Sequence, residues 1–370
     1  MWSYCNPVDV SFGAGAFEAL PKLINGRRYA IITYPDAPFE ALTQSLQKVA
    51  GAAVLVINDI APNPDFRLLG DQCARFDGLP QAPEVLVALG GGSVIDSAKV
   101  YAAALGDFRR VQRFLETKEG GSELGATPII AVPTTAGTGS EVTHWATVWD
   151  EQSNHKYSLA LLGLYPEHAV VDPALMLGKP AGLTLATGLD ALSHALESIW
   201  NINANPVSAR HAVFGAKTIL RDLPALMKDL GNLDLRSSIA EASLAAGLAF
   251  SNTKTSIAHN LSYPMTLGWH VQHGIACSFT LPVVLESVKG IGGFREDSLK
   301  DIFGPDLGAG AQQLTAFLAE LGVGHRMNDH GVPSTAFRMI VDEAFAGERG
   351  RNFVGQKENF LNAANRLGVI

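Results

Sequence analysis

The chain has few cysteines, few aromatic residues and no long uninterrupted apolar run. Among its 370 residues there are 3 cysteines, Cys5, Cys73 and Cys277, which lie far apart and form no CxxC pair. This argues against a disulfide framework, and we interpret all three as ordinary thiols of a reduced compartment. No stretch approaches the roughly 18 consecutive apolar residues that a membrane-spanning helix needs, and the N-terminus lacks a basic segment followed by an apolar one. We therefore expect a cytoplasmic protein with no membrane partner.

Positive charge is in deficit along the chain. There are 28 Lys and Arg against 36 Asp and Glu, a net charge of −8. No basic block stands out, so nucleic acid is not an expected partner. Hydrophobic residues make up 47% of the chain, which suffices for one large domain or two ordinary domains with cores of their own.

The first half of the chain alternates between strand and helix patterns. Longer amphipathic segments, such as 37–50 and 64–77, lie between several short apolar runs. The runs are "YAIITYP" (29–35), "AAVLVIND" (52–59), "EVLVALG" (84–90), "TPIIAVP" (127–133) and "EHAVVDP" (167–173). This alternation predicts an α/β domain with a mainly parallel sheet and covering helices.

The pattern changes after Pro180, where strand-like runs almost vanish and long helical patterns follow. These cover 184–201, 206–230, 235–250, 310–322, 334–345 and 356–366. We predict a domain boundary near 175–182. The chain is then an α/β domain over 1–178 and an all-helical domain over 179–370.

A glycine turn joins one predicted strand to a helix in "VLVALGGGSVIDSAKVYAAAL". The turn residues are Gly90, Gly91, Gly92 and Ser93. Glycines let backbone N–H groups approach a phosphate, although this is not the GxGxxG fingerprint and a plain tight turn is an equal alternative. A second loop, "PTTAGTGSEVT" (133–143), offers the hydroxyls of Thr134, Thr135, Thr138 and Ser140. Two such loops after strands suit a dinucleotide at the carboxyl edge of the sheet.

Four residues of metal-ligand type occur in the second half. In "GLDALSHALES", Asp190 and His194 are four apart and share a helix face. His259 and His273 follow, the latter in "VQHGIACS". Each histidine alone is more often structural, and an Asp–His pair at this spacing is common. Together, one aspartate and three histidines would suit a divalent transition metal.

Taken together, these motifs resemble the iron-dependent (group III) alcohol dehydrogenases. The resemblance rests on "GGGSVIDSAK" (90–99), "PTTAGTGSEVT" (133–143), "VVDPALM" (170–176), "ATGLDALSHALES" (186–198), "GLAFSN" (247–252) and "HGIACSFTLP" (273–282), in the family's order. It implies the dehydroquinate synthase-like architecture: an N-terminal dinucleotide-binding α/β domain, a helical C-terminal domain and a metal in the cleft between them. It also implies a homodimer acting on a small-molecule substrate.

The resemblance assigns roles residue by residue. It makes Asp190, His194, His259 and His273 the ligands of a divalent metal, Fe2+ or Zn2+. It puts Gly90, Gly91, Gly92, Ser93 and Asp96 at the pyrophosphate of the cofactor, Thr134, Thr135 and Thr138 beside the nicotinamide and phosphates, Lys156 near the adenosine, and Trp145 and Phe250 in the substrate pocket. The implied reaction is metal-assisted hydride transfer between a nicotinamide and a carbonyl carbon.

Three points stay open within this resemblance. Tyr34 stands where many NAD-preferring members have an aspartate, so NAD(H) and NADP(H) are both candidates. No general base is assigned; Tyr263 or His270 could relay a proton, and ordinary structural roles are equally compatible with both. A dehydroquinate synthase-like lyase and a metal-binding protein without catalysis are the rival classes, which the metal and cofactor motifs disfavour.

The segment "SNTKTSIAHNLSYPMT" (251–266) departs from the family pattern. Lys254, Thr255 and Ser256 replace a usually apolar, glycine-rich stretch, and Tyr263 replaces a second histidine. A cation with hydroxyls suits an anionic oxygen cluster, so we expect Lys254 and Thr255 to bind substrate. The alternative is a solvated helix start capped by Thr253 or Thr255. The segment resembles the branch that reduces phosphonoacetaldehyde, while a semialdehyde, maleylacetate or a short alcohol would suit other branches.

Overall fold

The computed structural model describes residues 1–150, 152 and 155–369. The chain forms two compact units. One comprises Pro7–Thr135 and Ser140–Met176, and the other comprises Met1–Asn6, Ala136–Gly139 and Leu177–Ile370. The short segments Met1–Asn6 and Ala136–Gly139 thus group with the helical unit, although the sequence-based boundary assigns them to the α/β domain.

A six-stranded parallel sheet forms the centre of the first unit, with strand order β1-β8-β5-β4-β2-β3. The strands are β1 (Asp9–Phe12), β2 (Tyr29–Thr33), β3 (Leu55–Ile57), β4 (Val85–Gly90), β5 (Ile129–Pro133) and β8 (His168–Val171). Five of them are the predicted apolar runs, and the predicted parallel sheet is confirmed. The short β1, half of whose residues are polar, has no such signature and was not predicted.

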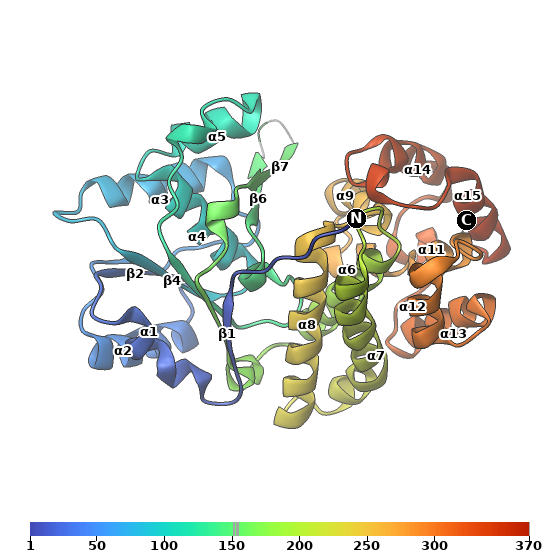
Figure 1. The fold of residues 1–370 in the computed structure, drawn as a ribbon, viewed down its shortest axis with the longest axis horizontal. Coiled ribbons are helices and arrows are strands. Elements are labelled where there is room, and N and C mark those ends of the chain that lie inside the picture. Colours follow the sequence, from blue (N-terminus) through green and yellow to red (C-terminus); the bar gives the residue numbers. More distant parts are fainter. Residues whose placement is uncertain (151, 153–154, 370) are drawn as a thin grey trace. The chain divides into compact units, whose positions relative to one another are not determined.

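Helices cover both faces of this sheet (Figure 1). They are α1 (Leu20–Ile24), α2 (Ala37–Ala50), α3 (Phe66–Asp77), α4 (Gly92–Ala104) and α5 (Phe108–Thr117), with short 3-10 turns η1 (Ala16–Ala19), η2 (Gly121–Glu123), η3 (Ser140–Val142), η4 (Leu162–Leu164) and η5 (Pro173–Met176). Along β4, Leu86 and Ala88 join one apolar cluster with α3, α4 and α5, whereas Val87 and Leu89 join a second cluster with α1 and α2. The strands are apolar on both faces because both faces are buried.

The second unit is a bundle of helices around one apolar core. The helices are α6 (Ala181–Ile199), α7 (Pro206–Lys228), α8 (Leu233–Thr253), α9 (Ile257–Trp269), α10 (His273–Ser278), α11 (Leu281–Ser287), α12 (Gly293–Phe303), α13 (Leu307–Glu320), α14 (Phe337–Ala346) and α15 (Lys357–Arg366), with 3-10 turns η6 (Met327–His330), η7 (Ser334–Ala336) and η8 (Gly350–Asn352). The first three, α6, α7 and α8, pack side by side (Figure 1). The predicted helical domain is confirmed. None of the described helices is both long and apolar enough to cross a membrane.

An antiparallel hairpin of β6 (Trp145–Asp150) and β7 (His155–Ala160) completes the α/β unit, and it was not predicted. A buried lysine of α4 binds the chain that leads into it. Lys99 Nζ lies 2.7 Å from Ser140 O, 2.8 Å from Ser140 Oγ, 3.1 Å from Thr143 Oγ1 and 2.9 Å from Trp145 O. Burial lowers the pKa of Lys99 to about 8, although Asp96 and Glu141 act to raise it.

We predict that Lys99→Met destabilises the protein by about 3 kcal/mol or more, since hydrogen bonds to a charged group contribute about 1.5–3 kcal/mol each and their buried acceptors would lose their partner. Urea denaturation followed by circular dichroism measures the effect. Lys48→Met is the matched control because Lys48 is exposed on α2. Equal midpoints for the two variants would contradict the structural role of Lys99.

Candidate metal centre and cofactor loops

Helix α6 presents three acidic or imidazole side chains on one face. Asp190, His194 and Glu197 follow each other at four and three residues, so they project in the same direction. All three are buried. Because an uncompensated buried charge is costly, this arrangement indicates that the charges are paired or bind a cation.

The structure brings all four predicted metal ligands together around one carboxylate oxygen. Asp190 Oδ1 lies 3.9 Å from His194 Nε2, 3.3 Å from His259 Nε2 and 3.9 Å from His273 Nε2. The four residues come from α6, α9 and the start of α10. Residues up to 83 positions apart therefore aim their donor atoms at a common point.

The donor atoms fit a divalent metal. Within the described part of the chain, neither Asp190 Oδ1 nor His259 Nε2 has a hydrogen-bond partner, although both are buried. Burial acts to raise the pKa of Asp190, but His194, His259 and His273 together lower it far below its usual range, so the carboxylate is ionised. One carboxylate and three imidazoles form a donor set suited to Fe2+ or Zn2+.

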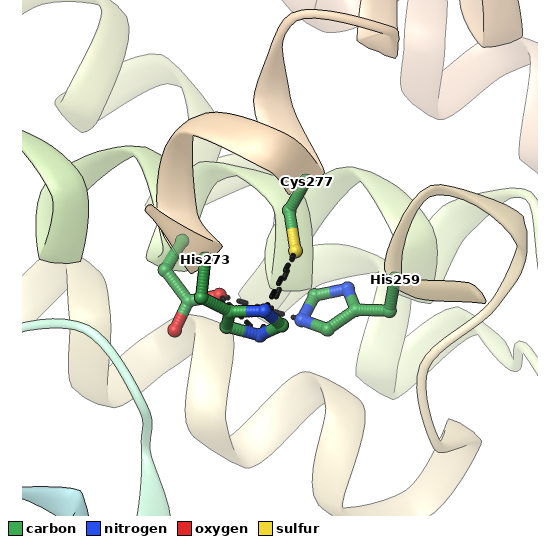
Figure 2. Close-up of side chains that lie close together, drawn as sticks. His259, His273 and Cys277 are labelled. Atoms are coloured by element: carbon green, nitrogen blue, oxygen red, sulfur yellow. Dashed lines mark hydrogen bonds and ion pairs between the residues drawn. The ribbon is translucent and has the colours of Figure 1, made fainter. Parts of the chain in front are cut away.

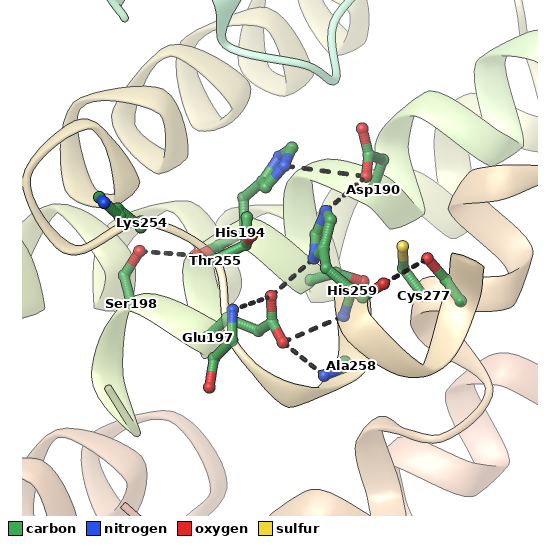
Figure 3. Close-up of polar contacts among 12 residues, drawn as sticks. Asp190, His194, Glu197, Ser198, Lys254, Thr255, Ala258, His259 and Cys277 are labelled. Carbon is green, nitrogen blue, oxygen red and sulfur yellow. Dashed lines mark hydrogen bonds and ion pairs between the residues drawn. The ribbon is translucent and has the colours of Figure 1, made fainter. Parts of the chain in front are cut away.

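Glu197, which sequence reasoning missed, orients His259 (Figure 3). Its carboxylate accepts a 2.6 Å hydrogen bond from His259 Nδ1 and further bonds from the backbone N–H groups of Ser256, Ala258 and His259. With its proton on Nδ1, the imidazole directs the lone pair of Nε2 at Asp190, and a cation between the two atoms relieves their repulsion. The i, i+3 spacing of Glu197 from His194 in "SHALE" was the signal available in the sequence.

His194 is held by a backbone carbonyl and two aromatic neighbours. Its Nδ1 lies 3.2 Å from Gly137 O, and its ring stacks on Phe250 at 4.2 Å and on His259 at 4.6 Å between centroids. Burial lowers the pKa of His194 to about 4, so the imidazole is neutral at pH 7 and its Nε2 can bind a metal. A Cβ on Gly137 would come within 2.6 Å of Thr187 Cβ, so glycine is required for this approach.

His273 occupies the more open side of the centre. Its side chain is 39% exposed, compared with 7% for His194 and 3% for His259. Helix α10 approaches α6 so closely that a Cβ on Gly274 would lie 1.9 Å from Ala186 O. Glycine at this position therefore allows His273 to reach the aspartate of α6.

Cys277 is a second feature that the sequence did not reveal (Figure 2). Its sulfur lies 3.6 Å from His273 Nε2, and the donor atoms of Asp190, His259, His273 and Cys277 all lie within 4.8 Å of one another. The interpretation of all three cysteines as ordinary thiols did not anticipate this. Burial raises the pKa of Cys277, so the sulfur remains a protonated thiol and a weaker ligand in the metal-free protein.

The unusual 251–266 segment joins two helices. Helix α8 ends at Thr253, and Lys254 follows with φ of 64°, in the left-handed region. Asparagine amides bind three successive carbonyls: Asn203 that of Thr253, Asn201 that of Lys254 and Asn352 that of Thr255. The predicted threonine cap is wrong, because Ser256 is the N-cap of α9 and the Glu197 carboxylate accepts from the N–H groups of Ser256 and Ala258. The exposed side chain of Lys254 agrees with the solvated surroundings that this alternative expected.

The predicted substrate and relay residues differ in their surroundings. Thr255 is buried, whereas the Lys254 side chain is 56% exposed and its Nζ lies 3.7 Å from Glu348 Oε1. Tyr263 lies parallel to His273, with ring centroids 6.1 Å apart. His270 is exposed and ends α9 in the left-handed conformation.

In the α/β unit, the glycine turn lies where β4 meets α4. Gly90 O accepts a hydrogen bond from Thr134 N, which joins the two predicted cofactor loops. A Cβ on Gly91 would lie 3.3 Å from Thr135 Oγ1 and 3.5 Å from the Tyr34 hydroxyl. A side chain at Gly91 would therefore crowd Thr135 and Tyr34, so glycine lets these neighbours approach the turn closely.

Of the remaining predicted residues, Asp96, Lys156 and Trp145 lie in or beside the hairpin of this unit, and Thr138 does not. The Asp96 carboxylate accepts bonds from Ser140 Oγ at 2.6 Å and Thr147 N at 2.8 Å, so it positions this loop. Lys156 Nζ lies 5.2 Å from the centroid of the Trp149 ring. Trp145 begins β6, whereas Thr138 belongs to the short segment that groups with the helical unit.

A parallel α/β unit with a glycine turn, followed by a helical unit with a buried Asp–His centre, is the architecture of a metal-dependent dehydrogenase. Comparison with known proteins identifies the family. Residues 7–173 match "iron-containing alcohol dehydrogenase", and residues 184–360 match the C-terminal part of the Fe-containing alcohol dehydrogenase family. The chain belongs to the iron-containing alcohol dehydrogenase family and is an oxidoreductase that uses a nicotinamide dinucleotide and a divalent metal.

Three relatives indicate the breadth of the similarity. The chain is 32% identical to alcohol dehydrogenase 4 of Saccharomyces cerevisiae (strain YJM789) over 297 residues, 77% of this chain and 75% of that one. It is 30% identical to 1,3-propanediol dehydrogenase of Citrobacter freundii over 363 residues, 93% and 92% of the two chains. The structure of sulfoacetaldehyde reductase from Bifidobacterium kashiwanohense in complex with NAD+ matches with a TM-score of 0.87 and 27% identity, covering 99% and 98%.

We predict that His194→Ala and His273→Ala lose the metal and with it at least about 100-fold in turnover, because each removes one of four donors. Cys277→Ala should keep near-normal metal content, since Asp190, His194, His259 and His273 already supply four donors. Metal analysis of the purified variants decides between the two donor sets. Metal loss in Cys277→Ala with full loading of His194→Ala would assign the sulfur in place of His194.

We predict that Tyr34→Asp shifts cofactor preference toward NADH. A carboxylate at the end of β2, beside the glycine turn, repels a 2′-phosphate and accepts bonds from ribose hydroxyls. The measurement is the ratio of kcat/KM for NADH and NADPH, with Tyr34→Phe as the control for loss of the hydroxyl alone. An unchanged ratio in Tyr34→Asp would mean that this side chain does not face the ribose.

Proposed function

We propose that this enzyme reduces a small anionic aldehyde to its alcohol, with phosphonoacetaldehyde and 2-hydroxyethylphosphonate as the best candidate pair. The observation that carries the proposal is the connection between the Lys254–Ser256 stretch and the metal centre. Ser256 N donates to Glu197 Oε2, and the same oxygen accepts from His259 Nδ1. Lys254, Thr255 and Ser256, the cation and hydroxyls that distinguish this chain, thus lie three to five residues before His259, a proposed metal ligand.

The similarity to a sulfoacetaldehyde reductase supports an anionic substrate. Sulfoacetaldehyde and phosphonoacetaldehyde are both two-carbon aldehydes that end in a tetrahedral oxyanion. They differ mainly in charge, because a phosphonate carries up to two negative charges and a sulfonate one. Sulfoacetaldehyde is accordingly the second candidate substrate.

In this proposal the metal is held by Asp190, His194, His259 and His273. When bound, the metal acts as a Lewis acid toward the substrate carbonyl. Glu197 keeps Nε2 of His259 unprotonated by accepting the Nδ1 proton, and Phe250 restricts the ring of His194. These contacts keep the donor atoms in place before substrate arrives, which limits the reorganisation that the reaction requires.

The nicotinamide supplies the hydride, and the alcohol oxygen takes up a proton. Tyr263 is better suited to deliver that proton than His270, because its ring lies parallel to His273 whereas His270 is exposed at a helix end.

For the dinucleotide we propose contacts from Gly90–Gly92, Ser93 and the threonine loop. The proposed cofactor side chains are Thr134, Thr135, Thr138 and Lys156, with Asp96 positioning the loop through Ser140. Thr255, Trp145 and Phe250 remain proposed substrate side chains, and Lys254 remains one with a smaller contribution, because its exposed Nζ lies 3.7 Å from Glu348 Oε1. A cytoplasmic homodimer remains part of the proposal.

The substrate class is tested by a screen of aldehydes with the metal-loaded enzyme and both NADH and NADPH. We expect kcat/KM to be about 10- to 150-fold higher for phosphonoacetaldehyde than for a neutral aldehyde of similar size, because an ionic hydrogen bond contributes about 1.5–3 kcal/mol. Sulfoacetaldehyde and succinic semialdehyde test whether the geometry or the charge of the anion matters. Absorbance of the nicotinamide band gives the rate.

A preference for propanal or butanal would contradict an anionic substrate and favour a short-alcohol dehydrogenase. Product formation without stoichiometric consumption of NADH would favour a lyase of the dehydroquinate synthase type. Equal rates for sulfonate and phosphonate would leave the anionic class intact while removing the reason to prefer the dianion.

A further inference from the structure

Arg349 is a cation of the helical unit that forms no ion pair with any of the described residues, and Glu197 is the carboxylate that acts on its charge. It follows α14 and is the residue before η8. Among the described residues, its guanidinium has neither a hydrogen bond nor an ion pair. It makes a cation–π contact, with Cζ 5.0 Å from the centroid of the Tyr263 ring. Burial lowers the pKa of Arg349 to about 10, although the Glu197 carboxylate acts to raise it, so the guanidinium is charged at pH 7.

The contact with Tyr263 connects the guanidinium to the open side of the metal centre. The Tyr263 ring lies parallel to the His273 ring, and His273 Nε2 is 3.9 Å from Asp190 Oδ1. His273 is also the most exposed of the three clustered imidazoles. Tyr263 and Arg349 therefore lie on the His273 side of the centre, which is its most exposed side.

Lys254, the cation expected from the sequence to bind substrate, is exposed and lies close to a carboxylate, unlike Arg349. Its side chain is mostly exposed and its Nζ already pairs with Glu348 Oε1 at 3.7 Å. Exposed pairs of this kind contribute little, and a substrate anion would have to compete with the carboxylate. Glu348 precedes Arg349 directly in the chain, yet it pairs with Lys254 and leaves the guanidinium available.

The backbone around Arg349 is fixed, so its side chain starts from a defined position. Asn352 N donates to Arg349 O at 3.0 Å, and Asn352 Nδ2 donates to Thr255 O at 2.9 Å. A Cβ on Gly350 would lie 1.9 Å from Ala344 O, which shows how closely this turn packs against α14. A fixed backbone and the contact with the Tyr263 ring both limit the positions of the guanidinium, which lowers the entropy lost on binding.

We propose that Arg349 is a substrate-specificity residue that binds the anionic end of the aldehyde through two parallel N–H···O bonds. This inference rests on the proposed function and names the group that recognises the anion. A guanidinium can donate two N–H groups to two oxygens of a phosphonate, a sulfonate or a carboxylate. The rates with phosphonoacetaldehyde, sulfoacetaldehyde and succinic semialdehyde show which of the three anions the enzyme prefers.

The test compares Arg349→Met, Arg349→Lys and the control Arg351→Met. Arg351 is exposed, and its side chain donates to the carbonyl of Ala346. Arg351→Met changes the net charge by the same amount as Arg349→Met, at a position two residues away. Arg349→Met should lower kcat/KM for phosphonoacetaldehyde about 10- to 150-fold, with less than about 3-fold change for propanal. Arg349→Lys should lose less, because it keeps the charge but not the paired donors. Lys254→Ala should lose no more than about 5-fold.

A second measurement separates substrate binding from a structural role. Calorimetric titration of the metal-loaded, NAD-bound enzyme with 2-hydroxyethylphosphonate should give a Kd weakened in Arg349→Met by a similar factor, at unchanged metal content. If this variant does not fold, Arg349→Lys carries the test by the same titration. A wild-type preference for the anionic aldehyde that persists in Arg349→Met and Arg349→Lys would overturn this inference alone. A wild-type enzyme that prefers propanal would overturn the proposed function as well.

Discussion

The convergence of three imidazole nitrogens on one buried carboxylate oxygen is the constraint around which the helical unit is organised. Burying Asp190 as an anion is unfavourable unless positive charge lies beside it. Burial acts to lower the pKa of His259, but Cys277, Glu197 and Asp190 raise it well above its ordinary value, which again indicates that this point of the bundle favours positive charge. A divalent metal satisfies the same demand with all four donors. The site therefore selects positive charge at one point of the bundle.

The surrounding structure makes this convergence possible through close backbone approach and one further carboxylate. Gly137 and Gly274 let two segments come nearer to α6 than any side chain would allow. Glu197 binds both the ring of His259 and the N–H groups at the start of α9, so a single side chain orients a ligand and its helix. A carboxylate at a helix N-terminus is also favoured by the helix dipole.

The α/β unit uses a buried charge in a similar way. Lys99 and Asp96 lie on α4 and bind the loop that contains Ser140, one through its ammonium and the other through its carboxylate. This fixes the start of the hairpin close to the glycine turn. In both units a charged side chain inside the protein determines where a loop lies, because a buried charge must find polar partners.

The sequence alone determined the periodic and compositional features: five of the six strands of the parallel sheet, the long helices after Pro180, the glycine turn and the four donor residues. The strands and helices depend on neighbouring residues, and hydrophobic periodicity reveals them. The roles of the four donor residues came instead from the resemblance of their motifs to a known family. The sequence could not reveal strand β1, the contact of Glu197 with His259, the sulfur of Cys277 beside the centre, or which partners Lys254 and Arg349 have. Those depend on distances between segments far apart in the chain. Lys254 drew notice in the sequence by its charge, but only the tertiary structure paired it with Glu348 and left Arg349 available beside Tyr263.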